Sequence, residues 1–270
     1  MSLLLCRQES VTNPYYIEPM GIRIWSSQEL SYVIYHNPLL VMDGFVDEHL
    51  IAFIRVELDM EFLAAKLEKW MASKEDKDQL LFIILSECGY YPAAEQARFR
   101  QQVTALRKLP QAEYIKQKGD YMFGRKQYGK AAAIYEKVLE LPGAGTANKE
   151  LTETIWCRLG CTYARMFQFP KAWTAFEKAY GCCQSQEILK RMYYLTRMGE
   201  ESHSRHFHLP PITEDQKAMW EKDISEAGER AKTSDSILKL EGLFQKDSIK
   251  RTAGALKLIK QWKQEYRGMM

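Results

Sequence analysis

The amino-acid sequence predicts an all-α protein built from paired helices, and three observations support this fold class. From Asp47 onward, apolar residues recur at the spacing of one helix face. Capping signals, glycines and prolines divide this part of the chain into segments of ordinary helix length. Two stretches near the middle of the chain are also similar to each other, and such internal similarity is typical of helical repeats.

The composition of the 270-residue chain is that of a globular protein. Hydrophobic residues make up 46% and charged residues 27%, and an aromatic content of 12% argues against long disordered segments. The net charge of +3 is too small to indicate a nucleic-acid partner. No apolar run approaches the roughly 18 residues of a membrane-spanning helix. We therefore expect no nucleic-acid partner and no membrane partner.

The N-terminus and the cysteines predict a cytoplasmic location. Residues 1–7 contain a short apolar stretch but lack the basic start and cleavage site of a signal peptide. The six cysteines do not follow the spacing of a disulfide framework, so reduced thiols are expected. They are Cys6, Cys88, Cys157, Cys161, Cys182 and Cys183.

The first 25 residues are the least helical part of the chain. Residues 15–25 carry aromatic and β-branched side chains around the turn signal Pro19-Met-Gly21, which predicts an extended segment such as a short hairpin. Residues 26–110 then form a helical N-terminal region. Ser26 opens it with a Ser-x-x-Glu capping box.

Residues 111–199 contain the two similar stretches. One begins at Gly119 and the other at Gly160, and in both an aromatic residue follows after nine positions, an alanine after twelve and a second aromatic after sixteen. These residues are Tyr128, Ala131 and Tyr135 in the first copy, and Phe169, Ala172 and Phe176 in the second. Four coincidences and a shared Glu-Lys pair within twenty positions indicate a true repeat.

The pattern resembles the tetratricopeptide repeat (TPR), a pair of helices of about 34 residues. The second copy carries most characteristic residues: Trp156, Leu159, Gly160, Tyr163, Ala172, Phe176 and Ala179. The first copy is looser and carries Ile115, Gly119, Met122, Ala131, Tyr135 and Val138. The resemblance implies a TPR-like helical-hairpin solenoid with helical N- and C-terminal extensions. Its glycines would let paired helices approach closely, its alanines would lie between them, and its aromatics would fill the wedge to the next repeat.

Two departures from the family pattern are visible. The repeat glycines lie 41 positions apart, and the surplus falls in a predicted loop at residues 142–147. Upstream, Tyr91-Pro-Ala-Ala94 repeats the aromatic-x-x-Ala element, but Phe82 stands in place of the glycine, so that unit is degenerate. The helix expected at residues 184–198 either caps the stack or begins a fourth unit.

Residues 200–212 are predicted to be a linker, and residues 213–270 to form C-terminal helices. The expected core of that last region is Trp220, Leu238, Leu240, Leu243, Phe244, Leu256, Ile259 and Trp262. The final helix is basic and amphipathic. It could bind a membrane or nucleic acid, but a cap with its polar side outward is the favoured interpretation.

Candidate chemistry is sparse. His203, His206 and His208 could bind a metal, but no further ligand at suitable spacing completes a site, so a solvated linker is favoured. Cys157 and Cys161 share a helix face, where packing or groove lining is favoured over zinc. No catalytic motif is present. We therefore expect no enzyme activity, no cofactor and no metal.

The resemblance implies a protein-protein interaction scaffold or peptide-binding adaptor, in which the inner helices line a concave groove. Transferred by repeat position, the groove residues are Glu113, Lys116, Asp120, Phe123, Thr154, Cys157, Cys161, Ala164 and Arg165. Acidic and basic members of this set offset each other, which favours a protein or peptide partner of mixed charge. The oligomeric state stays open.

Two other functions remain as alternatives. A peptide-responsive transcription regulator would place a DNA-binding helix-turn-helix before its repeats, but residues 26–58 contain no basic recognition helix. A metal-binding protein or an enzyme is the second alternative.

Overall fold

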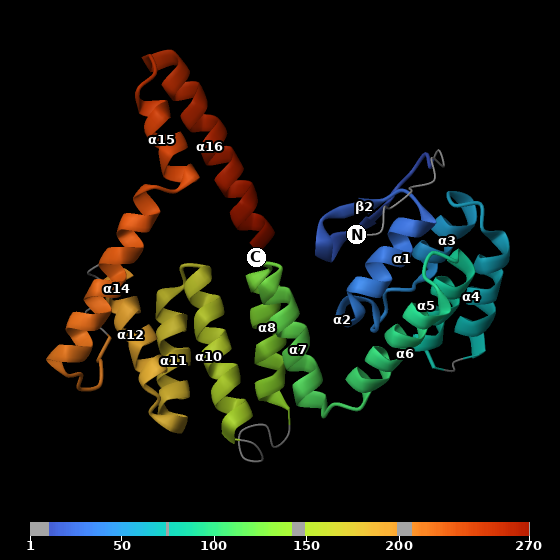
Figure 1. The fold of residues 1–270 in the computed structure, drawn as a ribbon, viewed down its shortest axis with the longest axis horizontal. Helices are drawn as coiled ribbons and strands as arrows, with labels where there is room; N and C mark the ends of the chain where they lie inside the picture. Colours follow the sequence, from blue (N-terminus) through green and yellow to red (C-terminus); the bar gives the residue numbers. More distant parts are fainter. Residues whose placement is uncertain (1–10, 74–75, 142–148, 199–206, 270) are drawn as a thin grey trace. The chain divides into compact units, whose positions relative to one another are not determined.

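The computed structural model describes residues 11–73, 76–141, 149–198 and 207–269. Within them the fold is helical apart from one two-stranded sheet, which confirms the predicted all-α class (Figure 1). No helix in these ranges has both the length and the apolar character needed to cross a membrane. The chain divides into two compact units, Met1–Lys118 and Gly119–Met270, and the division falls inside one helix.

The first unit is a hairpin followed by helices. Its elements are β1 (Tyr15–Ile17), the 3-10 turn η1 (Glu18–Met20), β2 (Ile22–Ile24), α1 (Ser27–His36), α2 (Pro38–Val41), α3 (Glu48–Val56), α4 (Glu61–Ser73), α5 (Asp78–Cys88) and α6 (Ala93–Arg107). The strands pair antiparallel, with Tyr15 opposite Ile24. Gly21 turns the chain between them at a φ of 66°, a conformation that suits glycine. The extended N-terminal segment therefore folds as a hairpin over residues 15–24.

Helix α1 begins at the predicted capping signal. The Ser26 hydroxyl accepts a hydrogen bond from the backbone N–H of Glu29 at 3.2 Å. The Glu29 carboxylate reaches one residue further back than in a standard capping box, because it accepts from the backbone N–H of Trp25 at 2.6 Å. The first of these bonds satisfies one of the four backbone N–H groups that a helix start leaves without a partner, and the second holds the residue just before the N-cap.

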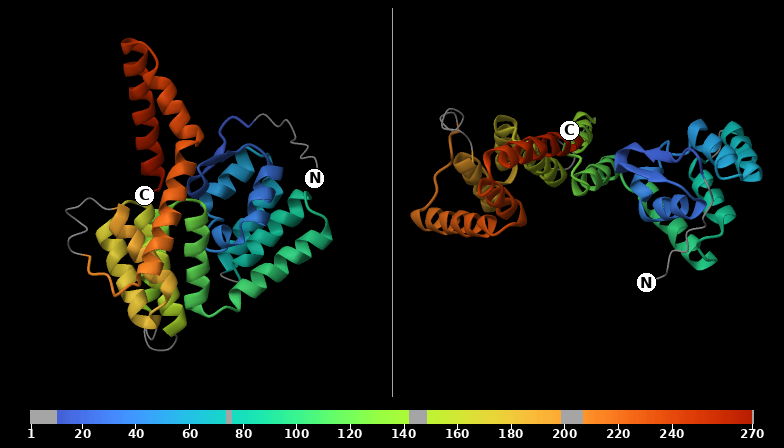
Figure 2. Two further views of the ribbon diagram at one scale, coloured as in Figure 1. Left: turned by 60° about the vertical axis from the view of Figure 1, so that its left-hand side comes forward. Right: turned by 90° about the horizontal axis from the view of Figure 1, so that it is seen from above.

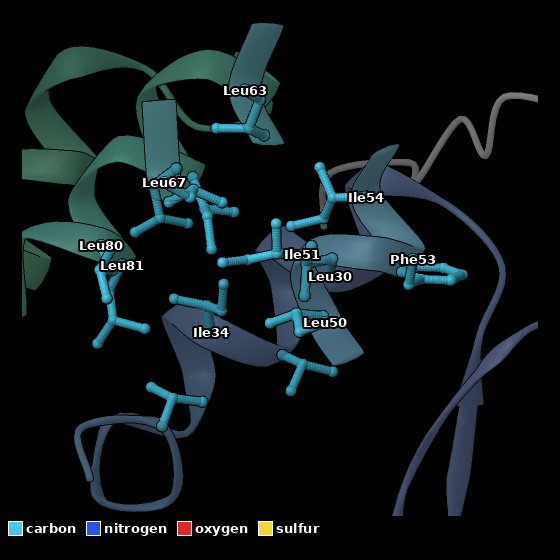
Figure 3. Packing of buried hydrophobic residues seen from close by; sticks show 14 of the residues in the cluster. Leu30, Ile34, Leu50, Ile51, Phe53, Ile54, Leu63, Leu67, Leu80 and Leu81 are labelled. Carbon is cyan, nitrogen blue, oxygen red and sulfur yellow. The ribbon is translucent and has the colours of Figure 1, made fainter. Parts of the chain in front are cut away.

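Helix α5 contributes several side chains to the first unit's core, and Figure 3 shows its Leu80 and Leu81 on one side of the buried cluster. It packs against α1, α4 and α6, and for that reason its apolar residues are buried on more than one face. The buried ones are Leu80, Leu81, Phe82, Ile84 and Leu85. Phe82, which replaces the repeat glycine in the degenerate unit, packs edge-on against Phe99 of α6, with ring centroids 5.9 Å apart.

A polar network connects α5, α6 and α7 (Gln111–Gly124) with the turn that follows α2. Arg107 donates two hydrogen bonds of 2.8 Å to the buried carboxylate of Asp78. The Asp43 carboxylate accepts from Arg107 at 3.1 Å, from the Tyr114 hydroxyl at 2.7 Å and from Lys118 at 2.8 Å. Burial alone would raise the pKa of Asp43, but these donors outweigh it and lower the pKa to about 2.

The second unit is a row of helices that ends at α14, followed by a helical hairpin made of α15 and α16 (Figures 1 and 2). Its elements are the second half of α7 (Gln111–Gly124), α8 (Tyr128–Glu140), α10 (Lys149–Arg165), α11 (Phe169–Cys183), α12 (Gln186–Met198), α14 (Glu214–Lys232), α15 (Asp235–Phe244) and α16 (Ser248–Met269). Neighbours in the row pack in the order α8, α10, α11 and α12. The loop predicted at residues 142–147 lies outside the described residues.

The two repeat copies make the same contact between their helices. A Cβ atom on Gly119 would lie 2.5 Å from the Tyr135 ring, and one on Gly160 would lie 2.5 Å from the Phe176 ring. Each aromatic ring therefore covers the glycine of its own helix pair. The expected position of these rings, in the wedge to the next repeat, did not include this contact with the glycine. Ala131 and the matching alanine of the second copy are fully buried. The sequence offsets therefore correspond to one packing arrangement used twice.

The end of the predicted linker is packed against the repeats. Its first part, residues 200–206, lies outside the described residues. Phe207 stacks on Trp173 of α11, with ring centroids 4.4 Å apart and the planes within 6°. Leu209 and Ile212 then pack against the cluster around Trp220, so the second half of this segment is held in place.

The prediction of a C-terminal core is largely wrong. Trp220 and Leu243 are buried, but five other expected core residues are exposed: Leu238, Phe244, Leu256, Ile259 and Trp262. The reason is that α15 and α16 form a hairpin that packs on itself at few points, such as Gly254 against Leu243. Most of the apolar stripe on α16 is left uncovered by the described part of the chain.

Candidate binding groove

The second unit contains a groove of about 770 Å³, bordered by helices α7, α8, α10, α11, α12 and α16. Its aromatic lining comes from Phe123, Tyr128, Phe167, Phe176 and Tyr194. Ala164, Leu195, Met198 and Met269 add aliphatic and thioether surface. This is the volume and apolar character usual in sites for small molecules or short peptide segments. The groove defined by these residues is hereafter called the binding groove.

Four of the residues selected from the sequence line the binding groove. Phe123 comes from the end of α7, and Cys161, Ala164 and Arg165 come from successive turns of α10. Positions transferred from two different repeats therefore meet in one cavity. Repeat position alone does not decide membership, because Cys161 lines the groove whereas Asp120, at the same offset from its glycine, does not.

The other five selected residues do not line it. Glu113, Lys116 and Thr154 are half-buried elsewhere on α7 and α10. Asp120 accepts a 2.6 Å hydrogen bond from the Tyr135 hydroxyl and pairs with Arg158 at 3.3 Å, so its charge is engaged inside the repeat. Cys157 lies beside Cys161 and contacts Arg191.

Sequence reasoning missed the contributions of the turns and of α12. Lys126 and Phe167 occupy the seventh position after the repeat glycines and connect the two helices of each pair. Both have a left-handed backbone, with φ of 61° and 59°. The equal offsets mark the two turns as equivalent, but lysine and phenylalanine carry no sequence signal for this conformation. Arg191 and Tyr194, in contrast, lie on α12, which carries no repeat motif to place them.

The charged groups of the binding groove are all cationic. They are Lys126, Arg158, Arg165 and Arg191, and no carboxylate is among the described lining residues. Arg158 is paired with Asp120, and Arg191 with Glu187 at 3.2 Å. Lys126 and Arg165 are exposed, and within the described chain neither has an ion-pair partner. These two cations are available to an anionic ligand.

The residues considered for metal binding give no assembled site in the described chain. His203 and His206 lie outside the described residues, and His208 is exposed. No group of three or more histidine, cysteine, aspartate or glutamate side chains with the geometry of a metal site occurs in the described ranges.

Comparison with known proteins adds no identification. No protein-family model matches the chain, and the searches of curated proteins and of solved structures gave no match. The function is therefore argued from the geometry and chemistry of the binding groove.

Proposed function

We propose that the chain is a protein-binding adaptor with a TPR-like second unit that holds an extended or helical segment of a partner in the binding groove. Two features support the TPR-like assignment. The repeat offsets in the sequence correspond to the same glycine-aromatic contact in both helix pairs. The selected residues Phe123 and Arg165, transferred from two repeats, line a single cavity.

The observation that carries the proposal is the exposed, conformationally costly position of Phe167. Its side chain is 72% exposed, and its left-handed backbone costs a non-glycine residue on the order of 1 kcal/mol. Lys126 occupies the equivalent position in the first repeat with the same conformation. Folding alone would favour glycine at both positions. Both turns border the binding groove, so a ligand held there would contact the Phe167 ring and the Lys126 cation.

The lining also indicates the chemistry of the partner. Aromatic rings dominate the walls, while the two available charges, Lys126 and Arg165, are both positive. The mixed charge expected from the sequence relied on Glu113 and Asp120, but neither lines the binding groove. The best fit is a partner segment with apolar anchors and at least one carboxylate nearby.

The test is a comparison of two double variants. Wild-type protein would first capture partners from native lysate, and the dissociation constant of the purified partner would then be measured. The Phe123→Ala/Arg165→Ala variant removes an anchor and an available cation. Each truncation should cost about 1–2 kcal/mol, which is roughly tenfold in affinity.

The matched control is Phe62→Ala/Arg98→Ala, which removes the same residue types from exposed positions in α4 and α6. It should bind as the wild type does, and both variants should retain helical circular dichroism. Wild-type affinity in the groove variant would refute the proposal.

A further inference from the structure

Helix α10 places two cysteines one turn apart, facing a single arginine of α12. Arg191 Nη1 lies 2.9 Å from the Cys157 sulfur and 3.1 Å from the Cys161 sulfur. Both cysteines are free and half-buried. A guanidinium has only donors, so both sulfurs must accept from it. A thiolate accepts far better than a thiol, because charge-assisted hydrogen bonds are the stronger ones.

The arrangement favours one proton shared between the two sulfurs. The hydrogen bond from Cys157 to Cys161 lowers the pKa of Cys161; burial opposes this shift, while Arg191 and Arg158 add to it. The same hydrogen bond, together with burial, raises the pKa of Cys157. The contacts with Arg191 and Cys157 therefore favour the thiolate form at Cys161 over that at Cys157.

We propose that Cys161 is a site of covalent oxidation by small hydroperoxides, formed by the Cys157–Cys161–Arg191 cluster. Cys161 is among the residues that line the open binding groove, which gives a small oxidant a route to it. In the reaction the sulfur attacks one oxygen of hydrogen peroxide and the O–O bond breaks. The cysteine becomes a sulfenic acid, and the second oxygen leaves as hydroxide, which a solvent proton converts to water. Sulfur is oxidised by two electrons and the peroxide is reduced by two.

The helix geometry determines which product accumulates. Residues four apart on a helix have Cβ atoms about 5–6 Å apart, whereas a disulfide requires about 3.8 Å. Closing a Cys157–Cys161 disulfide would therefore distort α10, and the sulfenic acid is expected to persist. If the proposed binding function also holds, this added oxygen modifies the wall of the binding groove. The oxidation site itself does not depend on that function.

The experiment compares cysteines within the full-length protein. The reduced protein would be treated with hydrogen peroxide at pH 6 in the presence of dimedone, which traps sulfenic acids, and labelling would be mapped by mass spectrometry. Cys182, which is also half-buried, is the internal reference. Cys161 should be labelled about tenfold faster, since its larger thiolate fraction outweighs its lower intrinsic nucleophilicity. Equal rates at Cys161 and Cys182 would overturn the proposal.

Two substitutions in α12 test the role of the arginine. Arg191→Met removes the guanidinium that contacts both sulfurs, whereas Arg197→Met removes an exposed arginine of the same helix that pairs with Glu221. Labelling of Cys161 should rise with pH around the same midpoint in the wild type and in Arg197→Met, below the midpoint of an ordinary cysteine thiol. In Arg191→Met the midpoint should move to higher pH, and an unchanged midpoint would contradict the assigned role. The comparison of cysteines in the wild type needs no substitution, so it remains decisive even if Arg191→Met fails to fold.

Discussion

At the scale of single residues, one glycine in each repeat sets how closely its two helices approach. Gly119 and Gly160 lie directly beneath the rings of Tyr135 and Phe176, both of which are buried. A methyl group at either glycine would overlap a ring that cannot move into solvent. The internal similarity of the sequence thus reflects a steric requirement.

Gly160→Ala should lower the free energy of unfolding by about 1–3 kcal/mol, the usual cost of overpacking a core. Gly181→Ala is the control, because Gly181 lies in α11 with open space around it. That substitution should be neutral or stabilising by up to about 1 kcal/mol, since alanine is the better helix former. Urea denaturation followed by circular dichroism measures both. Equal stability of the two variants would show that the ring does not constrain Gly160.

Residue patterns predicted some parts of the binding groove and not others. Phe123 and Ala164 each follow their repeat glycine by four positions, and both line the binding groove. The contact of Arg191 with the two cysteines could not be predicted. Arg191 lies 30 or more positions further along the sequence than either cysteine, and no motif marks α12. The mixed charge expected for the binding groove was also wrong. The sequence does not show that Asp120 accepts a hydrogen bond from Tyr135 and pairs with Arg158 instead of lining the groove.

At the scale of elements, local signals placed the helices well. Ser26 caps α1, and Gly89 ends α5 in the left-handed conformation that glycine favours. The apolar stripes of α15 and α16 correctly indicated helices, but the burial that we expected from them is wrong for most of their residues. An apolar stripe shows which face would pack and does not show that a partner element exists. Residues such as Leu256 and Trp262 are therefore exposed although their spacing is that of a core.

The Asp43 network makes the stability of the first unit depend on pH. The folded-state pKa of Asp43, about 2, lies below its ordinary value of 3.8. A lowered carboxylate pKa contributes stability that is fully present above about pH 4 and is lost as the pH falls toward 2. Because Asp43 is 37% exposed, solvent screening reduces the contribution to about 1 kcal/mol.

Asp43→Asn should therefore unfold with a free energy about 1 kcal/mol lower than the wild type at pH 7, and the difference should shrink to near zero at pH 2. The comparison requires urea denaturation of both proteins across this pH range. A difference that stays constant from pH 7 to pH 2 would mean that the charge of Asp43 does not stabilise the fold.

At the scale of the whole molecule, the chain combines two compact units that share helix α7. The second unit carries the features on which the proposed function rests: the duplicated glycine-aromatic contact, the two left-handed turn residues and the binding groove. The sequence predicted the helix pairs because their contacts are local and repeated. It could not outline the groove, since α12 and α16 complete its lining through contacts between distant parts of the chain.

Site-specific photocrosslinking would show whether a partner segment lies in the binding groove. Benzoylphenylalanine would replace Ala164, which lines the groove, or Ala133, an exposed alanine of α8 that does not. On irradiation with the captured partner, position 164 should give a covalent adduct and position 133 little. Equal adducts at both positions, or an adduct from position 133 alone, would rule out a partner segment in the binding groove.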